Sequence, residues 1–109
     1  VTPNTPMRDE LLCIKSIGNA YYMKNDFANA YDKHILALNL LDITPELGGN
    51  ELVRSELLIE VANDLVKLEQ KDEAAKNYKE VLEILKGKEQ NSRVLDLLER
   101  ASKGLKELN

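Results

Sequence analysis

Residues 17–30 read IGNAYYMKNDFANA and contain the end of one helix, a break and the start of another. The break is Asn25-Asp26, and Asp26 can cap the second helix. A break this short places consecutive helices antiparallel, so the sequence predicts a hairpin of helices over about 6–24 and 27–42. The first of these helices has apolar or small residues at steps of three and four, the period of one buried face: Leu11, Ile14, Ile17, Gly18 and Tyr21.

Three further breaks divide the rest of the chain. Residues 44–50, TPELGGN, form the only Pro/Gly cluster in the interior, and Asn50 can cap a third helix. The sequence QKD at 70–72 marks another tight turn, and Gly87 suits the C-terminal cap of the fourth helix. The predicted fold is therefore all-α, with five helices in a hairpin over 6–42, a hairpin over 51–86 and a single helix over 92–107.

The composition agrees with one small helical domain. The chain has 109 residues, of which 43% are hydrophobic and 31% are charged, and its net charge is −4. Leucine, glutamate and lysine outnumber β-branched residues, which favours helix over strand. Because the charges are interspersed, no basic stripe is available for a nucleic acid. No apolar run reaches the roughly 18–20 residues that span a bilayer, so we expect no membrane partner either.

Other simple features bound the function. One cysteine and one histidine exclude an internal disulfide and argue against a Cys/His metal site, so we expect no cofactor. The N-terminus lacks the pattern of a signal peptide, and we expect a cytoplasmic protein. Because the chain begins at Val1, we expect it to be a fragment of a larger protein.

A shift of 44 residues aligns the two hairpins with each other. The small pairs Gly18/Ala62 and Ala30/Ala74 let the helices of each hairpin approach closely. A helical hairpin of this kind leaves one apolar face uncovered, so copies are expected to stack as a solenoid. The shift also aligns six larger pairs: Ile14/Leu58, Ile17/Val61, Tyr21/Leu65, His34/Tyr78, Ala37/Val81 and Leu38/Leu82.

The first copy resembles a tetratricopeptide repeat. The signature of that repeat is a Leu-Gly pair, an aromatic residue, a Gly-Asp-aromatic turn, an alanine and a late Ala-Leu pair. In the same order, the matching residues here are Ile17-Gly18, Tyr21, Asn25-Asp26-Phe27, Ala30 and Ala37-Leu38. The second copy is degenerate, with Glu69 at the turn glycine and Lys71 at the turn aromatic. The resemblance covers about residues 8–86 and implies a short right-handed α-solenoid.

Two features depart from this resemblance. The 44-residue spacing exceeds the usual spacing of about 34, so the second and third helices or their loop must be longer than usual. The fifth helix has Leu98 where a further full repeat would need a small residue. It is therefore similar to the capping helix that ends such arrays.

The resemblance also implies a concave groove, lined by the first helix of each hairpin, that binds an extended peptide or a partner's helix. An asparagine amide can hold a peptide backbone, although neighbouring groups of the chain could equally satisfy it. Asn19 and Asn63 occupy the same place in both copies. The candidate binding residues are Lys15, Asn19, Tyr22, Glu60, Asn63 and Lys67, and the rest of the implied lining is Leu12, Ser16, Met23, Glu56, Ile59 and Val66.

One specialised ligand of the family is disfavoured. Lys15 and Asn19 resemble the start of the clamp by which chaperone-binding members hold a C-terminal carboxylate. Glu60 stands where that clamp has an asparagine, while Ser92 and Asp96 stand where it has basic groups. Acidic side chains would repel the incoming carboxylate, so we reject this ligand.

The remaining polar residues predict no catalytic site. His34 is expected to pack with one hydrogen bond, Cys13 to be half-buried, and the pair Glu56/Glu60 to be ordinary surface charge. The sequence has no nucleophile–base pair and no phosphate-binding glycine loop, so we expect no enzyme. The expected function is a module that binds a protein or peptide. The alternative is a sensory, regulatory or self-association domain of a bacterial transcription regulator or signalling protein, which could form a homo-oligomer.

Overall fold

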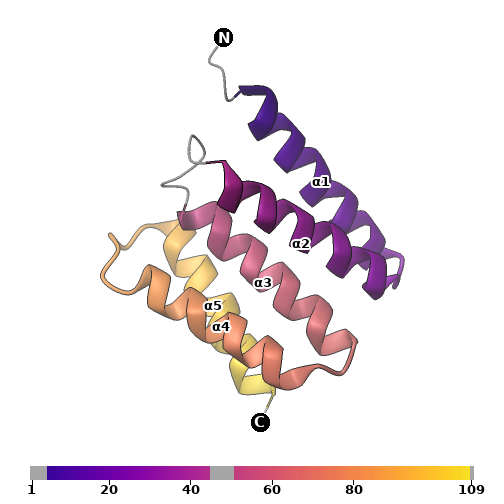
Figure 1. Ribbon diagram of the computed structural model, residues 1–109. Coiled ribbons are helices and arrows are strands. Elements are labelled where there is room, and N and C mark those ends of the chain that lie inside the picture. Colours follow the sequence, from indigo (N-terminus) through magenta and orange to yellow (C-terminus); the bar gives the residue numbers. More distant parts are fainter. Residues whose placement is uncertain (1–4, 45–50, 109) are drawn as a thin grey trace.

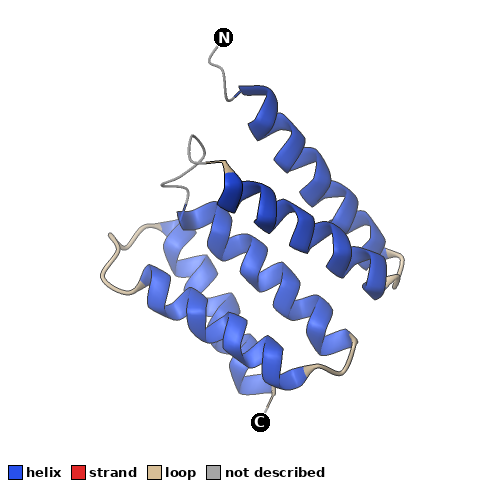
Figure 2. Cartoon of the chain, in the orientation of Figure 1, coloured by secondary structure: helices blue, strands red, loops and turns tan. Residues whose placement is uncertain are grey.

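The computed structural model describes residues 5–44 and 51–108, and every regular element in this part of the chain is an α-helix (Figures 1 and 2). The all-α prediction is confirmed, and the helix bounds differ from the predicted ones by at most two residues. The predicted cap Asn50 lies outside the described residues. The helices are α1 (Thr5–Met23), α2 (Phe27–Ile43), α3 (Glu51–Lys67), α4 (Lys71–Leu85) and α5 (Ser92–Glu107).

The helices pack as two hairpins and a closing helix. α1 packs on α2, and α3 packs on α4. α3 also covers α2, while α5 covers α4 and touches α3. In Figure 1, α1, α2 and α3 lie side by side in chain order, and α5 lies behind α4. The position of α5 on the second hairpin therefore matches that of α3 on the first.

The two hairpin turns have the same backbone conformation. Asn25 and Glu69, which are 44 residues apart, have positive φ angles of 64° and 63°. The amide of Asp26 donates to the carbonyl of Tyr21 at 2.9 Å, and the amide of Gln70 donates to the carbonyl of Leu65 at 2.8 Å. This hydrogen bond closes a helix end whose left-handed position usually holds glycine. The predicted turn at Asn25-Asp26 is thus confirmed. The second turn lies at 68–70, two residues before the predicted 70–72, because α4 already begins at Lys71.

Glu69→Gly should raise the free energy of unfolding by about 0.5–1 kcal/mol, because glycine adopts a left-handed backbone without strain. Glu69 is exposed, so the change removes no packing. Urea unfolding of the two proteins measures the difference. In the control Glu80→Gly, an exposed position inside α4, the same exchange should lower stability by about 1 kcal/mol. Equal losses at both positions would contradict a left-handed Glu69.

The core is centred on α3, where nine of 17 residues are buried. The alanines at the predicted close contacts, Ala30, Ala62 and Ala74, are fully buried. The prediction for Ile17 is wrong, because its side chain is 41% exposed while its counterpart Val61 is 2% exposed. The reason is position in the stack. α3 has helices on both sides, whereas no described helix covers the side of α1 that faces away from α2.

The small residue of α5 is Gly104. A Cβ atom there would lie 2.6 and 2.7 Å from Cε1 and Cε2 of Tyr78, so the ring packs directly on the α5 backbone. Gly18 in α1 meets the His34 ring in the same way, with a Cβ atom 2.7 Å from Cδ2. The sequence comparison placed Leu98 of α5 at the position of the small residue. It therefore did not predict the contact between Gly104 and Tyr78, because Leu98 lies six residues away from that glycine.

Candidate functional site

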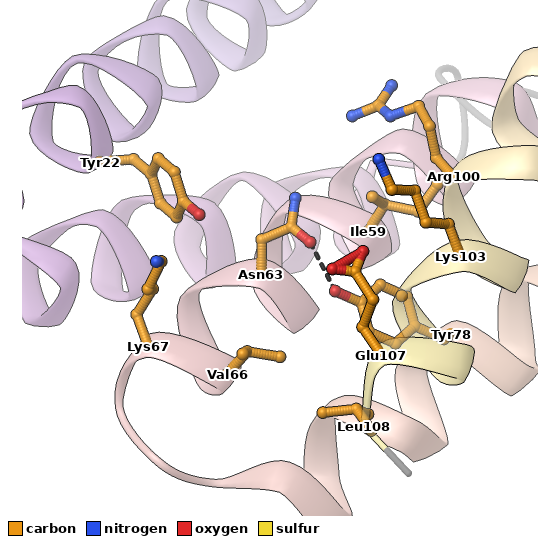
Figure 3. A pocket seen from close by; sticks show the side chains of 11 residues that line it. Tyr22, Ile59, Asn63, Val66, Lys67, Tyr78, Arg100, Lys103, Glu107 and Leu108 are labelled. Carbon is orange, nitrogen blue, oxygen red and sulfur yellow. Dashed lines mark hydrogen bonds between the residues drawn. The ribbon is translucent and has the colours of Figure 1, made fainter.

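A pocket of about 350 Å³ lies between the end of α1 and helices α3, α4 and α5 (Figure 3). Five of the predicted groove residues line it: Tyr22, Ile59, Asn63, Val66 and Lys67. The other lining residues come from α4, α5 and the residue after α5, and they are Tyr78, Arg100, Lys103, Gly104, Glu107 and Leu108. The sequence had indicated the α3 side of this pocket but not the α5 side.

A hydrogen bond from Tyr78 fixes the orientation of Asn63 in this pocket. The Tyr78 hydroxyl donates to Oδ1 of Asn63 at 2.5 Å (Figure 3). Burial raises the pKa of Tyr78 to about 12, and the nearby Tyr22 and Glu107 add to this effect. The hydroxyl therefore keeps its proton at neutral pH and remains the donor. Because Oδ1 of Asn63 already accepts this hydrogen bond, its amide N–H groups are the atoms left to donate to a ligand.

The first hairpin contains the equivalent polar pair. Nε2 of His34 lies 2.9 Å from Oδ1 of Asn19, and the 44-residue shift converts this pair into Tyr78 and Asn63. Both asparagines thus accept a hydrogen bond from the second helix of their own hairpin. His34 makes more than the single hydrogen bond that we expected, since its Nδ1 lies 2.5 Å from Oδ2 of Asp64.

The histidine belongs to a buried cluster of titratable side chains between α2 and α3. Asp64 is fully buried, and Glu60 is 9% exposed with its Oε2 atom 3.4 Å from Nε2 of His34. Burial raises the pKa of both carboxyls, although the contacts of Asp64 with His34, and of Glu60 with Lys15 and His34, oppose the shift. The expectation that Glu60 is ordinary surface charge is therefore wrong. Its helix is covered by neighbours on both sides, which a local charge pattern does not reveal.

Lys15 joins this cluster to α1. Its Nζ contacts Glu56 and lies 3.0 Å from Oε1 of Glu60. Burial alone would lower the pKa of Lys15, but the hydrogen bonds to the two glutamates outweigh it and raise that pKa. Arg93 of α5 contacts the second carboxylate oxygen of Glu56, Oε2, at 2.6 Å. The charge of Lys15 is thus already neutralised within the chain.

A smaller pocket of about 60 Å³ lies beside the first and shares Tyr22 and Asn63 with it. Its remaining lining residues are Asn19, His34 and Glu60. Of the six predicted binding residues, five therefore line one pocket or the other, and Lys15 is ion-paired to Glu60 next to them.

Residues 5–44 and 51–108 contain neither a metal-binding cluster nor a helix that could span a membrane. These residues contain no group of three or more His, Cys, Asp or Glu side chains placed to hold a metal ion. None of the described helices is long and apolar enough to cross a membrane. Cys13 is exposed and not half-buried as predicted, because it lies on the uncovered side of α1. Comparison of the chain with protein-family models, with curated proteins and with solved structures finds no match.

Proposed function

We propose that this chain is a non-enzymatic interaction module, built from tetratricopeptide-like hairpins, that binds an extended peptide along the face shared by α1, α3 and α5. The observation that carries the proposal is the larger pocket, whose lining includes five of the groove residues expected from the repeat. These three helices are the first helix of each hairpin and the closing helix. They are the elements that a stacked array presents on one side.

The chemistry of the larger pocket suits a peptide. Apolar side chains of Ile59, Val66 and Leu108 lie beside the donor groups of Asn63 and Lys67. Ligand sites typically combine an apolar lining with a few polar groups that fix orientation, in volumes of about 300–1,000 Å³. The pocket volume of about 350 Å³ is at the low end of that range, which fits one or two side chains of a peptide better than a large enclosed ligand.

Filling the pocket should weaken peptide binding at least tenfold. Peptides are first selected from a phage-displayed library of random dodecamers on the wild-type chain, and their affinities are then measured by fluorescence anisotropy. Lys67→Trp places a bulky side chain at the pocket, and because Lys67 is exposed the fold should remain intact. Circular dichroism and thermal unfolding verify this.

The matched control is Lys79→Trp, the same exchange at an exposed position of α4 that does not line the pocket. Selected peptides should bind this variant with wild-type affinity. Equal affinities of the two tryptophan variants and the wild type would show that the peptides bind elsewhere, and the proposed groove would be wrong.

A further inference from the structure

We propose that the larger pocket selects acidic peptides, in which Asp or Glu side chains within an extended segment occupy the α5 end of the pocket. This inference rests on the proposed function and adds the ligand's chemical class. Its basis is an excess of positive charge and of hydrogen-bond donors on the pocket lining, in a chain whose net charge is −4.

Three cationic side chains line the pocket and one anionic side chain opposes them. Lys67 comes from α3, while Arg100 and Lys103 come from α5. Figure 3 shows Lys67 on one side of Asn63 and the two α5 cations on the other. The one acid is Glu107, so the lining carries an excess of two positive charges. A peptide carboxylate between the two sides would meet cations from both.

These cations are weakly engaged within the chain. Arg100 is paired with Asp96 at 3.8 Å on its own helix, a distance at which an exposed pair contributes little. The Lys67 ammonium lies 5.8 Å from the centre of the Phe27 ring, and Lys103 has no ion pair among the residues that the structure describes. Their charges remain available to a ligand.

The neutral groups of the pocket complement an acceptor. Because Oδ1 of Asn63 accepts from Tyr78, the N–H groups of Asn63 are the part of this side chain left to bind a ligand. A carboxylate accepts several hydrogen bonds and donates none, so it can use these N–H groups together with the lysine and arginine donors. A basic or neutral side chain in the same place would leave several of these donors without an acceptor.

The α1 end of the same face is unsuitable for an acidic side chain of the peptide. There Lys15 is already neutralised by Glu56 and Glu60, and Glu60 lies mostly buried beside Asn19 and Tyr22 in the smaller pocket. A ligand carboxylate near Lys15 would meet two like charges. The acidic residues are therefore assigned to the α5 end, next to Arg100 and Lys103.

The experiment uses three rhodamine-labelled peptides. The first is GSDEEDLSG with rhodamine on its N-terminal amine and an amidated C-terminus. The second is its neutral counterpart GSNQQNLSG with the same ends, and the third is the neutral sequence with the same label and a free C-terminal carboxylate. Anisotropy titrations at low salt should show that the acidic peptide binds the wild-type chain at least tenfold more tightly than either neutral peptide. Added 0.5 M NaCl should remove most of this preference, because it screens the charges.

Three variants report on the assigned residues. Lys103→Glu should weaken binding of GSDEEDLSG at least tenfold, and Glu107→Gln should strengthen it two- to fivefold by removing a like charge from the pocket. Lys79→Glu, the same reversal outside the pocket on the exposed side of α4, should change the affinity less than twofold. Lys103→Glu and Lys79→Glu change the net charge equally, so the difference between their affinities separates a pocket effect from a general change in net charge.

Three results would overturn the inference. The first is equal affinity for the acidic and the neutral amidated peptides, and the second is an equal loss of affinity in Lys103→Glu and Lys79→Glu. The third is tight binding of only the peptide with the free C-terminus, which would assign the pocket to a chain end.

Failure of the proposed function is a separate result. If GSDEEDLSG binds Lys67→Trp as well as it binds the wild type, the groove itself is wrong. If library peptides bind in a way that Lys67→Trp blocks but carry no acidic residues, the groove stands and only its acidic preference falls.

Discussion

Asp64→Ala should lower the free energy of unfolding by about 3 kcal/mol, because it leaves a buried hydrogen-bonding group without its partner, at a usual cost of about 1–3 kcal/mol, and also opens a cavity. Asp64 is fully buried, and its Oδ2 atom lies 2.5 Å from Nδ1 of His34. Without this carboxyl group, the buried imidazole loses its closest hydrogen-bond partner, and a cavity takes the place of the aspartate side chain. Small domains have only about 5–15 kcal/mol of stability in total, so urea denaturation should show a large fall in the midpoint.

Two comparisons identify the cause of this loss. Asp96→Ala removes an exposed aspartate whose ion pair with Arg100 is 3.8 Å long, and it should cost no more than about 0.5 kcal/mol. Combining Asp64→Leu with His34→Leu should cost less than the sum of the single changes, because neither polar group is then left buried alone. Additive losses, or an Asp64→Ala cost no larger than that of Asp96→Ala, would show that the pair does not form in solution.

The helices and turns could be predicted because their signals are local. Asp26 caps α2 by accepting from the amide of Asn29, as its position in the sequence indicates. Gly87 has a φ angle of 80°, which suits the helix end that we predicted there. The repeat register was also accessible, since the shift of 44 residues relates turns, small residues and the pairs Asn19/His34 and Asn63/Tyr78.

Burial of individual side chains depended on neighbours that the sequence does not reveal. Ile17 and Val61 hold equivalent positions, yet only the second is buried, because α3 has described helices on both sides and α1 does not. Asp64 lies among apolar residues of α3. Its carboxyl group can be buried there only if another helix supplies a hydrogen-bond partner. That partner, His34, is 30 residues away. Helical periodicity alone does not connect the two.

The candidate site was predictable on α3 and not on α5. Asn63, Val66 and Lys67 follow from the repeat register, but Arg100 and Lys103 come from a helix that carries no copy of the signature. On the sequence, these cations are typical of the solvated face of an amphipathic helix. They become part of a pocket only because Gly104 brings the backbone of α5 against the Tyr78 ring. The glycine therefore determines how the charged side of the pocket is placed.

Gly104→Ala should lower the free energy of unfolding by about 1–3 kcal/mol, although alanine is the better helix former by about 1 kcal/mol. The added Cβ would lie 2.6 Å from Cε1 of Tyr78, a ring that is 3% exposed and whose hydroxyl is bonded to Asn63. Either the ring must move and lose that bond, or α5 must move away. The control Ser102→Ala, at an exposed position of the same helix, should change stability by less than about 0.5 kcal/mol.

Gly104→Ala and Gly18→Ala should destabilise different helices, because the two glycines contact the rings of different hairpins. In a stacked array each unit is stabilised mainly by its neighbours, so Gly104→Ala should accelerate amide hydrogen exchange in α4 and α5 while α1 stays protected. Gly18→Ala, whose Cβ would meet the His34 ring of the first hairpin, should do the reverse and accelerate exchange in α1 and α2. Uniform acceleration in every helix by either change would mean that the hairpins unfold as one unit. Unchanged exchange in α5 with Gly104→Ala would show that this helix does not pack on Tyr78, and the assignment of Arg100 and Lys103 to the pocket would fail with it.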